Sequence, residues 1–141
     1  MPSILRYPSK VQNIEGNNIP YLSCDHIENI TNDLPVEKVE EIVKDADAEV
    51  IFCGHTHVPC GYATNIGKTV VNAGSVGRPF SETPKSCYAI ITIAENGDYE
   101  IEHKLIAYDF ETAAQKLEKR NFSGCEKLAA MLRKATSRYP Q

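Results

Sequence analysis

The sequence predicts a layered α/β domain that combines a mixed or antiparallel sheet with two helices at its carboxyl-terminal end. First, an amphipathic stretch leads into a short apolar run, Glu49 to Cys53, which is typical of a strand buried on both faces. Second, pairs of β-rich segments follow, separated by glycine-containing turns. Third, two stretches that begin with helix-capping residues close the chain. Helices and strands are therefore expected to share one core.

The chain has the size and composition of one globular domain, with 141 residues, 42% hydrophobic and 24% charged. Its net charge of −4 disfavours nucleic acid as a partner, other than as a substrate. No apolar run approaches the roughly twenty residues of a membrane helix, and the amino terminus lacks a signal-peptide core. We therefore expect a cytoplasmic protein with no membrane partner. Its five cysteines contain no Cys-x-x-Cys pair, which favours reduced, buried thiols.

The chain divides at residue 35. Residues 1–34 carry prolines and a polar run without an apolar period, so we expect an irregular amino-terminal arm. Residues 35–141 are expected to form the folded domain. Pro35 suits the first turn of a helix, and the apolar residues after it recur at steps of three and four. That spacing predicts a helix over about 35–46.

Turn and capping signals predict the remaining elements. Two short strands are expected at 58–64 and 69–72, around a glycine-containing turn. Asn96-Gly97 separates two β-rich runs, 86–94 and 99–108, and so predicts a long hairpin. Asp109 can cap a helix over 109–120, and Ser123 to Glu126 has the capping-box spacing of a final helix that reaches about 137.

The segment Gly54-His55-Thr56-His57 follows the predicted buried strand directly. Two histidines two residues apart lie on the same side of an extended backbone, where neutral ring nitrogens can approach one cavity. This arrangement predicts a metal site. The alternative is a pair of polar loop histidines without a ligand.

A glycine-rich segment, Asn72 to Pro79, follows the strand predicted at 69–72. Its glycines permit tight turns and the close approach of a ligand, while Ser75 offers a hydroxyl and Arg78 a fork for phosphate oxygens. The alternative is a structural turn with a solvated arginine.

Taken together and in this order, the two segments resemble the calcineurin-like metallophosphoesterases, in particular their small single-domain phosphodiesterase branch. The resemblance covers about residues 35–137 and corresponds to the carboxyl-terminal half of that domain. It implies an αββα sandwich, here partial, and a phosphate-ester substrate. It also implies hydrolysis of phosphodiester or phosphomonoester bonds by a metal-bound hydroxide at two divalent metals. The sequence does not distinguish manganese, iron, nickel and zinc.

By the same resemblance, His55 and His57 are metal ligands and Gly54 makes the turn that presents them. The resemblance also places the glycine-rich segment close to the site, with Ala73 standing where the family usually has proline. The residues of that segment expected near the substrate are Asn72, Gly74, Ser75 and Arg78.

The family's other ligand motifs precede Gly-His-x-His along the chain, and none of them is present here. They are Asp-x-His, Gly-Asp, Gly-Asn-His followed by an acid, and His-Gly. The only upstream histidine, His26, is followed by isoleucine and is taken as a polar arm residue. Two histidines are fewer than the three ligands that a catalytic zinc requires. We therefore expect the isolated chain to be inactive, and we assign it no catalytic residue.

Three explanations remain open: a fragment or truncated gene model, a split enzyme completed by a complementary half-domain, or a degenerate member kept as a non-catalytic interaction module. An uncovered sheet edge favours a homo-oligomer or another partner. Two further side chains are taken as structural. Alternating spacing predicts that His103 packs on a sheet face, and Cys53 lies in a buried strand, where a thiol is inert.

Overall fold

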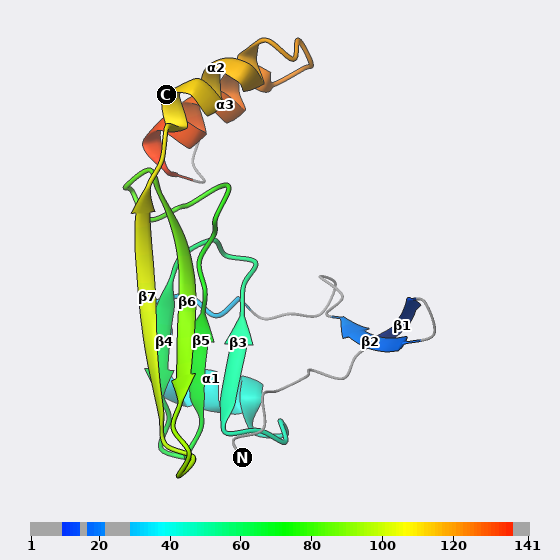
Figure 1. The fold of residues 1–141 in the computed structure, drawn as a ribbon, viewed down its shortest axis with the longest axis vertical. Helices are drawn as coiled ribbons and strands as arrows, with labels where there is room; N and C mark the ends of the chain where they lie inside the picture. The colour runs from blue at the N-terminus through cyan, green and yellow to red at the C-terminus, as the bar shows by residue number, and fades with distance from the viewer. Residues whose placement is uncertain (1–9, 15–16, 22–28, 137–141) are drawn as a thin grey trace.

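The computed structural model describes residues 10–14, 17–21 and 29–136. Its elements follow one another in an order that matches the expected one from residue 35 onward (Figure 1). They are β1 (Lys10–Ile14), β2 (Asn17–Tyr21), α1 (Val36–Val43), β3 (Val50–Cys53), β4 (Cys60–Ala63), β5 (Thr69–Asn72), β6 (Lys85–Ile93), β7 (Tyr99–Ala107), α2 (Phe110–Glu118) and α3 (Cys125–Lys134). The expected α/β class is confirmed.

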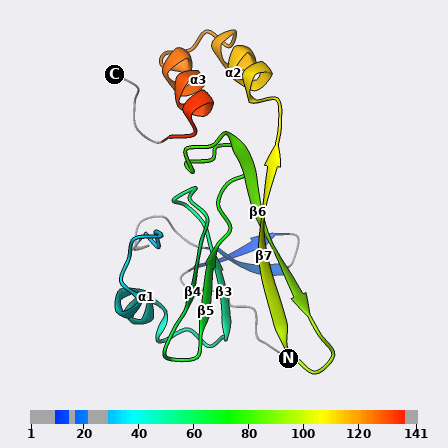
Figure 2. The ribbon, with the colours of Figure 1, turned by 90° about the vertical axis from the view of Figure 1, so that its left-hand side faces the viewer.

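The central sheet has the strand order β3-β5-β4, with β3 parallel and β4 antiparallel to β5. Helix α1 covers one face of this sheet and the β6–β7 hairpin lies over the other (Figure 2). The apolar stripe of α1 explains its place, because Val39 and Val43 are fully buried against Ile51 and Val70 of the sheet. The buried strand predicted before Gly54 is β3, in which Val50 and Ile51 are almost inaccessible.

The β6–β7 hairpin packs against the central sheet through polar as well as apolar contacts. The hydroxyls of Tyr99 and Thr69 lie 2.7 Å apart, and His103 Nε2 donates to the backbone oxygen of Asn72 at 2.8 Å. His103 is thus a packed sheet histidine, as expected. No described helix covers the opposite face of the hairpin (Figure 2), where Tyr88, Ile90 and Ile106 are exposed. The described residues therefore supply only part of an αββα sandwich.

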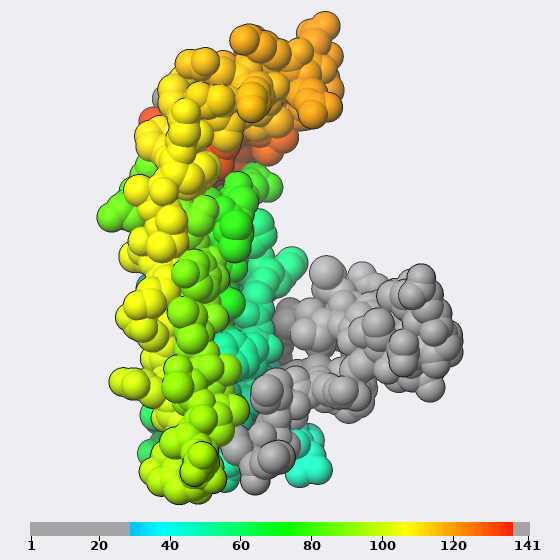
Figure 3. Space-filling model, viewed as in Figure 1, coloured from blue at the N-terminus to red at the C-terminus, as the bar shows by residue number. Residues whose placement is uncertain are grey.

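Helices α2 and α3 pack together beyond the ends of the strands rather than over a sheet face (Figures 1 and 3). Their shared core is small and consists mainly of Ala114, Ala129 and Leu132. The predicted cap of α2 is confirmed, since the Asp109 carboxylate accepts from the Thr112 backbone amide at 2.9 Å. Such a cap satisfies one of the free amides of the first turn.

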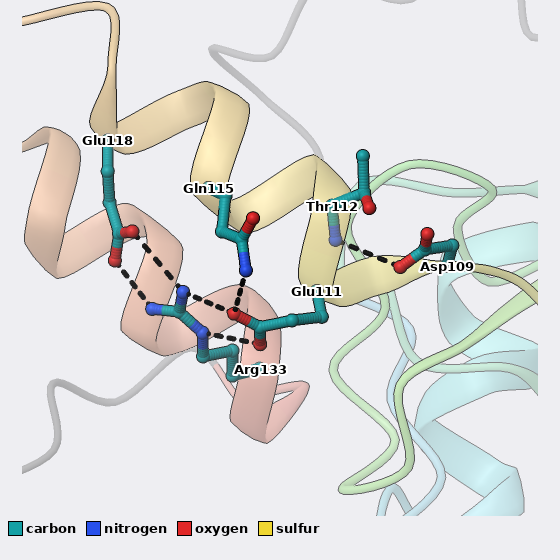
Figure 4. A network of polar contacts seen from close by, with 6 residues as sticks. All are labelled: Asp109, Glu111, Thr112, Gln115, Glu118 and Arg133. Atoms are coloured by element: carbon teal, nitrogen blue, oxygen red, sulfur yellow. Dashed lines mark hydrogen bonds and ion pairs between the residues drawn. The ribbon is translucent and has the colours of Figure 1, made fainter.

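One arginine ties the two helices together (Figure 4). Arg133 of α3 donates to both carboxylate oxygens of Glu111 at 2.8 Å and to Glu118 at 2.6 Å. Both glutamates belong to α2, so the guanidinium bridges two turns of the neighbouring helix. These hydrogen bonds hold the pKa of Glu111 and of Glu118 below the ordinary glutamate value.

We expect Arg133→Met to lower the unfolding midpoint near neutral pH and to have a smaller effect in acid. A depressed carboxylate pKa in the folded state contributes stability that is present above the unfolded pKa and is lost as the pH falls through the folded value. Protonated Glu111 and Glu118 no longer pair with the guanidinium, so the difference between wild type and variant should shrink as the pH falls through the lowered pKa values of the folded state. Thermal melts followed by circular dichroism over a pH series test this. A deficit of equal size at every pH would show that Arg133 acts by packing alone.

Two expectations about local structure are wrong. The arm is not wholly irregular, because β1 and β2 pair as an antiparallel hairpin in which Pro20 lies opposite Val11. In the sequence, Glu15-Gly16 is a glycine-containing pair of the kind found in hairpin turns, and such a turn signal is independent of apolar periodicity. The capping box is also absent, since α3 begins after Gly124 in the left-handed conformation, without a side-chain cap. The division of the chain at residue 35 stays a prediction.

None of the helices in the described part of the chain combines the length and the apolar character needed to cross a membrane.

Candidate metal centre

The two sequence motifs meet at one edge of the central sheet. Gly54 to His57 follows β3 and the glycine-rich loop follows β5, and these strands are parallel neighbours with Cys53 opposite Asn72. The Ala73 amide donates to the Cys53 carbonyl at 3.1 Å, which extends the ladder beyond the last strand residues. The carboxyl ends of adjacent parallel strands are the usual place for a site in an open α/β sheet.

Asn72 joins these loops from a fully buried position. Its Nδ2 lies within hydrogen-bond distance of three acceptors, the carbonyls of Ile30 (3.2 Å) and Gly54 (3.0 Å) and the Thr56 hydroxyl (2.8 Å). Its Oδ1 accepts from the Gly74 amide at 3.1 Å. The side chain thus fixes the backbone on both sides of the site, which is a positioning role.

The backbone at the two histidines differs from the expected extended form. His55 and His57 have φ values of 74° and 62°, which lie in the left-handed region. Histidine adopts this conformation more often than most residues with a Cβ, but at a cost in energy, and such positions cluster at functional sites. The expectation of an extended backbone is therefore wrong, because the chain turns sharply after β3.

Relief of this strain should be measurable at His55, whose side chain is exposed. We expect His55→Gly to be more stable than His55→Ala by about 1 kcal/mol, because only glycine adopts a positive φ without steric cost. Chemical denaturation of the two variants measures the difference. Equal stabilities, or a more stable alanine variant, would mean that His55 does not hold its left-handed backbone in solution.

His57 is half-buried and its ring is held at a defined atom. Its Nδ1 lies 2.7 Å from the backbone oxygen of Arg78. A carbonyl oxygen only accepts, so in the neutral imidazole Nδ1 carries the proton and Nε2 keeps its lone pair. A backbone partner on one ring nitrogen is typical of a histidine that binds a metal through the other.

The remaining predicted residues lie in the glycine-rich loop. Ser75 Oγ accepts from the Arg78 amide at 3.0 Å, and the Ser75 carbonyl accepts from the Cys87 amide at 2.9 Å. The guanidinium of Arg78 lies over the Phe80 ring, 5.1 Å from its centroid, and Nη2 is 3.8 Å from Met131 Sδ. The serine and arginine side chains therefore have partners within the protein, and a contact of either with a substrate stays a prediction.

The thiols near the site are not nucleophiles at neutral pH. Burial, with a smaller contribution from Cys60, raises the pKa of Cys53 to about 12. Burial likewise raises the pKa of Cys60 and of Cys87. Because the thiolate is the reactive form, these side chains are inert, as expected for Cys53.

The donor set that the structure describes fits part of a metal site. No group of three or more His, Cys, Asp or Glu side chains comes together among residues 10–14, 17–21 and 29–136. His57 has the form of a metal ligand, and His55 is the neighbouring donor in sequence, so they would fill two positions. The third histidine considered, His26, lies outside the described residues.

Phe80 is the residue of this region that the sequence motifs did not single out. Its ring stacks on His57, with centroids 4.8 Å apart and an angle of 22° between planes, and its amide donates to the His57 carbonyl at 3.2 Å. Nothing in its sequence position, two residues after Arg78, links it to a histidine more than twenty residues earlier. The contact arises only from the approach of the two loops.

The fold is that of a metallophosphoesterase. A metallophosphoesterase from Sphaerobacter thermophilus superposes with a TM-score of 0.64 at 19% identity, over 77% of this chain and 49% of that one. A conserved uncharacterized protein from Streptococcus pneumoniae, described as a predicted phosphoesterase, gives a TM-score of 0.41 at 20% identity, over 52% of this chain and 42% of that one. The chain thus spans about half the length of these structures.

The chain belongs to the calcineurin-like phosphoesterase superfamily, whose domain model matches residues 8–96. The match includes both motifs of the candidate centre and confirms the family that the sequence resembles. It begins within the segment that we expected to be an arm outside the domain. The comparison with curated proteins found no match.

Proposed function

We propose that this chain contributes to a metal-dependent phosphoesterase site in which His55 and His57 are two of the metal ligands. The observation that carries the proposal is the anchored imidazole of His57. Its Nδ1 donates a hydrogen bond to the Arg78 carbonyl at 2.7 Å, which leaves the lone pair of Nε2 available to a metal. Membership of the phosphoesterase superfamily supports the phosphate-ester substrate. The hydrogen bonds of Asn72 support it further, because the side-chain amide joins both motif loops at one sheet edge.

When bound, divalent metals would lower the pKa of a water and stabilise the charge that develops on phosphate oxygens. The residues of this chain would bind the metal and position the loops. His57 would donate a nitrogen lone pair in a fixed tautomer, and Asn72 would keep the loop that carries it in register with the glycine-rich loop. Further ligands would have to come from outside the described residues, because a catalytic site needs at least three protein ligands for one metal.

A hydrolysis assay tests the enzyme hypothesis. The 141-residue chain is incubated with manganese and a chromogenic phosphodiester, beside His57→Ala and beside Phe122→Leu, a change at an exposed residue remote from the motifs. Turnover that requires manganese, disappears in His57→Ala and persists in Phe122→Leu would support the proposal. Background hydrolysis in all three proteins would remove the enzyme hypothesis for this chain.

One observation favours a second candidate, a non-catalytic interaction module. Within the described part of the chain the metal-ligating side chains are too few for a complete centre, while the hairpin face that carries Tyr88, Ile90 and Ile106 is exposed. A module would bind a partner through that face and would show no manganese-dependent turnover. The assay above separates the two candidates, and sedimentation of the same samples tests for a homo-oligomer.

A further inference from the structure

The imidazole of His57 is constrained in two independent ways. The hydrogen bond from Nδ1 to the Arg78 carbonyl fixes which edge of the ring faces the glycine-rich loop. The Phe80 ring, stacked at 4.8 Å and 22°, fixes the plane of the imidazole. A half-turn of the imidazole about χ2 would place a carbon where Nδ1 now faces the Arg78 carbonyl. During that rotation the ring must tilt out of its plane, and the stacked aromatic ring opposes the tilt.

His55 provides the internal comparison. It is the other proposed ligand, yet it is exposed, and in the part of the chain that the structure describes no hydrogen bond or ring contact reaches its imidazole. The two histidines are therefore presented differently by the same loop. His57 is preorganised, whereas His55 is free to adopt more than one ring orientation.

Phe80 is itself held from a third element. The Arg78 guanidinium lies 5.1 Å from its ring centroid, a distance at which a cation is attracted to an aromatic face. Nη2 of this arginine contacts the Met131 sulfur of α3, and the Glu82 amide donates to the Ala135 carbonyl at 3.1 Å. The end of α3 thus packs on the loop that carries the stacked ring.

We infer that Phe80, held by the Arg78 side chain against α3, is a positioning residue that keeps His57 in the Nδ1–H tautomer with Nε2 available to a metal. The inference deepens the proposed function and rests on it for the role of the metal. It assigns Arg78 a different part from the phosphate contact expected from sequence, because its guanidinium acts on the aromatic ring. It also makes α3 part of the support of the site.

The test observes the ring without depending on activity. Long-range proton–nitrogen spectra of the metal-free, 141-residue chain report the tautomer of each histidine. We expect a single Nδ1–H tautomer for His57 and a mixture for His55. Phe80→Leu, which keeps an apolar side chain but removes the aromatic face, should convert His57 to a mixture. Phe80→Tyr should preserve the single tautomer, and Phe122→Leu, the matched change at an exposed phenylalanine, should leave it unaltered.

Manganese titration of the same samples adds the second readout. Paramagnetic broadening of the His57 ring signals gives an apparent affinity, which we expect Phe80→Leu to weaken about tenfold, as loss of a residue that supports a metal ligand does. Phe80→Tyr should retain the wild-type affinity. A purely structural role for Phe80 would lower stability without changing the tautomer.

The outcomes separate the inference from the function on which it rests. An unchanged His57 tautomer in folded Phe80→Leu overturns the inference, whether or not manganese binds. If that variant does not fold, the wild-type spectrum tests the inference. A mixture of tautomers at His57, or the absence of a nuclear Overhauser effect between His57 and Phe80, would also overturn it. If the tautomer depends on Phe80 but neither histidine responds to manganese, the positioning stands and the proposed metal site fails.

Discussion

Replacing Asn72 with leucine is expected to lower the free energy of unfolding by about 3–5 kcal/mol, a large share of the stability of a small domain. The variant keeps a side chain of similar volume in a fully buried position but loses every hydrogen bond of the amide. The Gly74 amide and the Ile30 carbonyl would lose a buried partner, and each such group costs about 1–3 kcal/mol. Urea denaturation measures the loss.

Two comparisons sharpen this result. Asn72→Asp has nearly the same shape but no amide donors, so it should not restore stability. Asn65→Leu changes an exposed asparagine in the turn between β4 and β5, where a surface substitution alters stability by about 0.5 kcal/mol or less. If Asn72→Leu were as mild as Asn65→Leu, the amide would not be the link between the motif loops.

Gly74→Ala is expected to cost about 3 kcal/mol, whereas Gly97→Ala should cost about 1 kcal/mol. Both glycines have a positive φ, 76° and 93°, so both variants carry the strain of a left-handed alanine. Only at Gly74 would the new Cβ also clash, lying 3.0 Å from Cys87 Cβ, 3.1 Å from its Sγ and 3.3 Å from Pro59 Cβ. At Gly97 nothing lies within 4 Å.

The difference between the two glycine variants measures the close packing of the glycine-rich loop on β6. A double-mutant cycle with Cys87→Ala tests its origin, because removal of the sulfur relieves one of the short contacts. We expect Cys87→Ala to cost less stability in the Gly74→Ala background than in wild type. Equal costs for the two glycine variants, or an additive cycle, would show that the loop does not approach Cys87 as closely as described.

Most of the fold beyond residue 35 was predictable from local signals. Asn96-Gly97 indicates the β6–β7 hairpin because a two-strand turn needs residues that tolerate a positive φ, and Gly97 has one of 93°. Asp109 indicates the start of α2 because a carboxylate satisfies a free amide of the first turn. The same local reasoning failed for β1 and β2, where prolines and polar residues obscured a hairpin.

The candidate centre was predictable as two motifs but not as a geometry. The order of Gly54 to His57 and Asn72 to Pro79, each after a strand, indicates a site at the end of a sheet because neighbouring parallel strands end together. The left-handed backbone at both histidines was not predictable, since it follows from the sharp turn of the loop after β3.

The motifs, the turns, the cap of α2 and the family therefore follow from residues that are close together in the chain, where each backbone preference acts locally. The partners of the key side chains depend on tertiary structure instead. Asn72 binds a carbonyl 42 residues away, Arg133 reaches a glutamate 22 residues away, and Phe80 stacks on His57. Such contacts form only when packing brings separate elements together, because the free energy that stabilises them comes from interactions between segments that are distant in sequence.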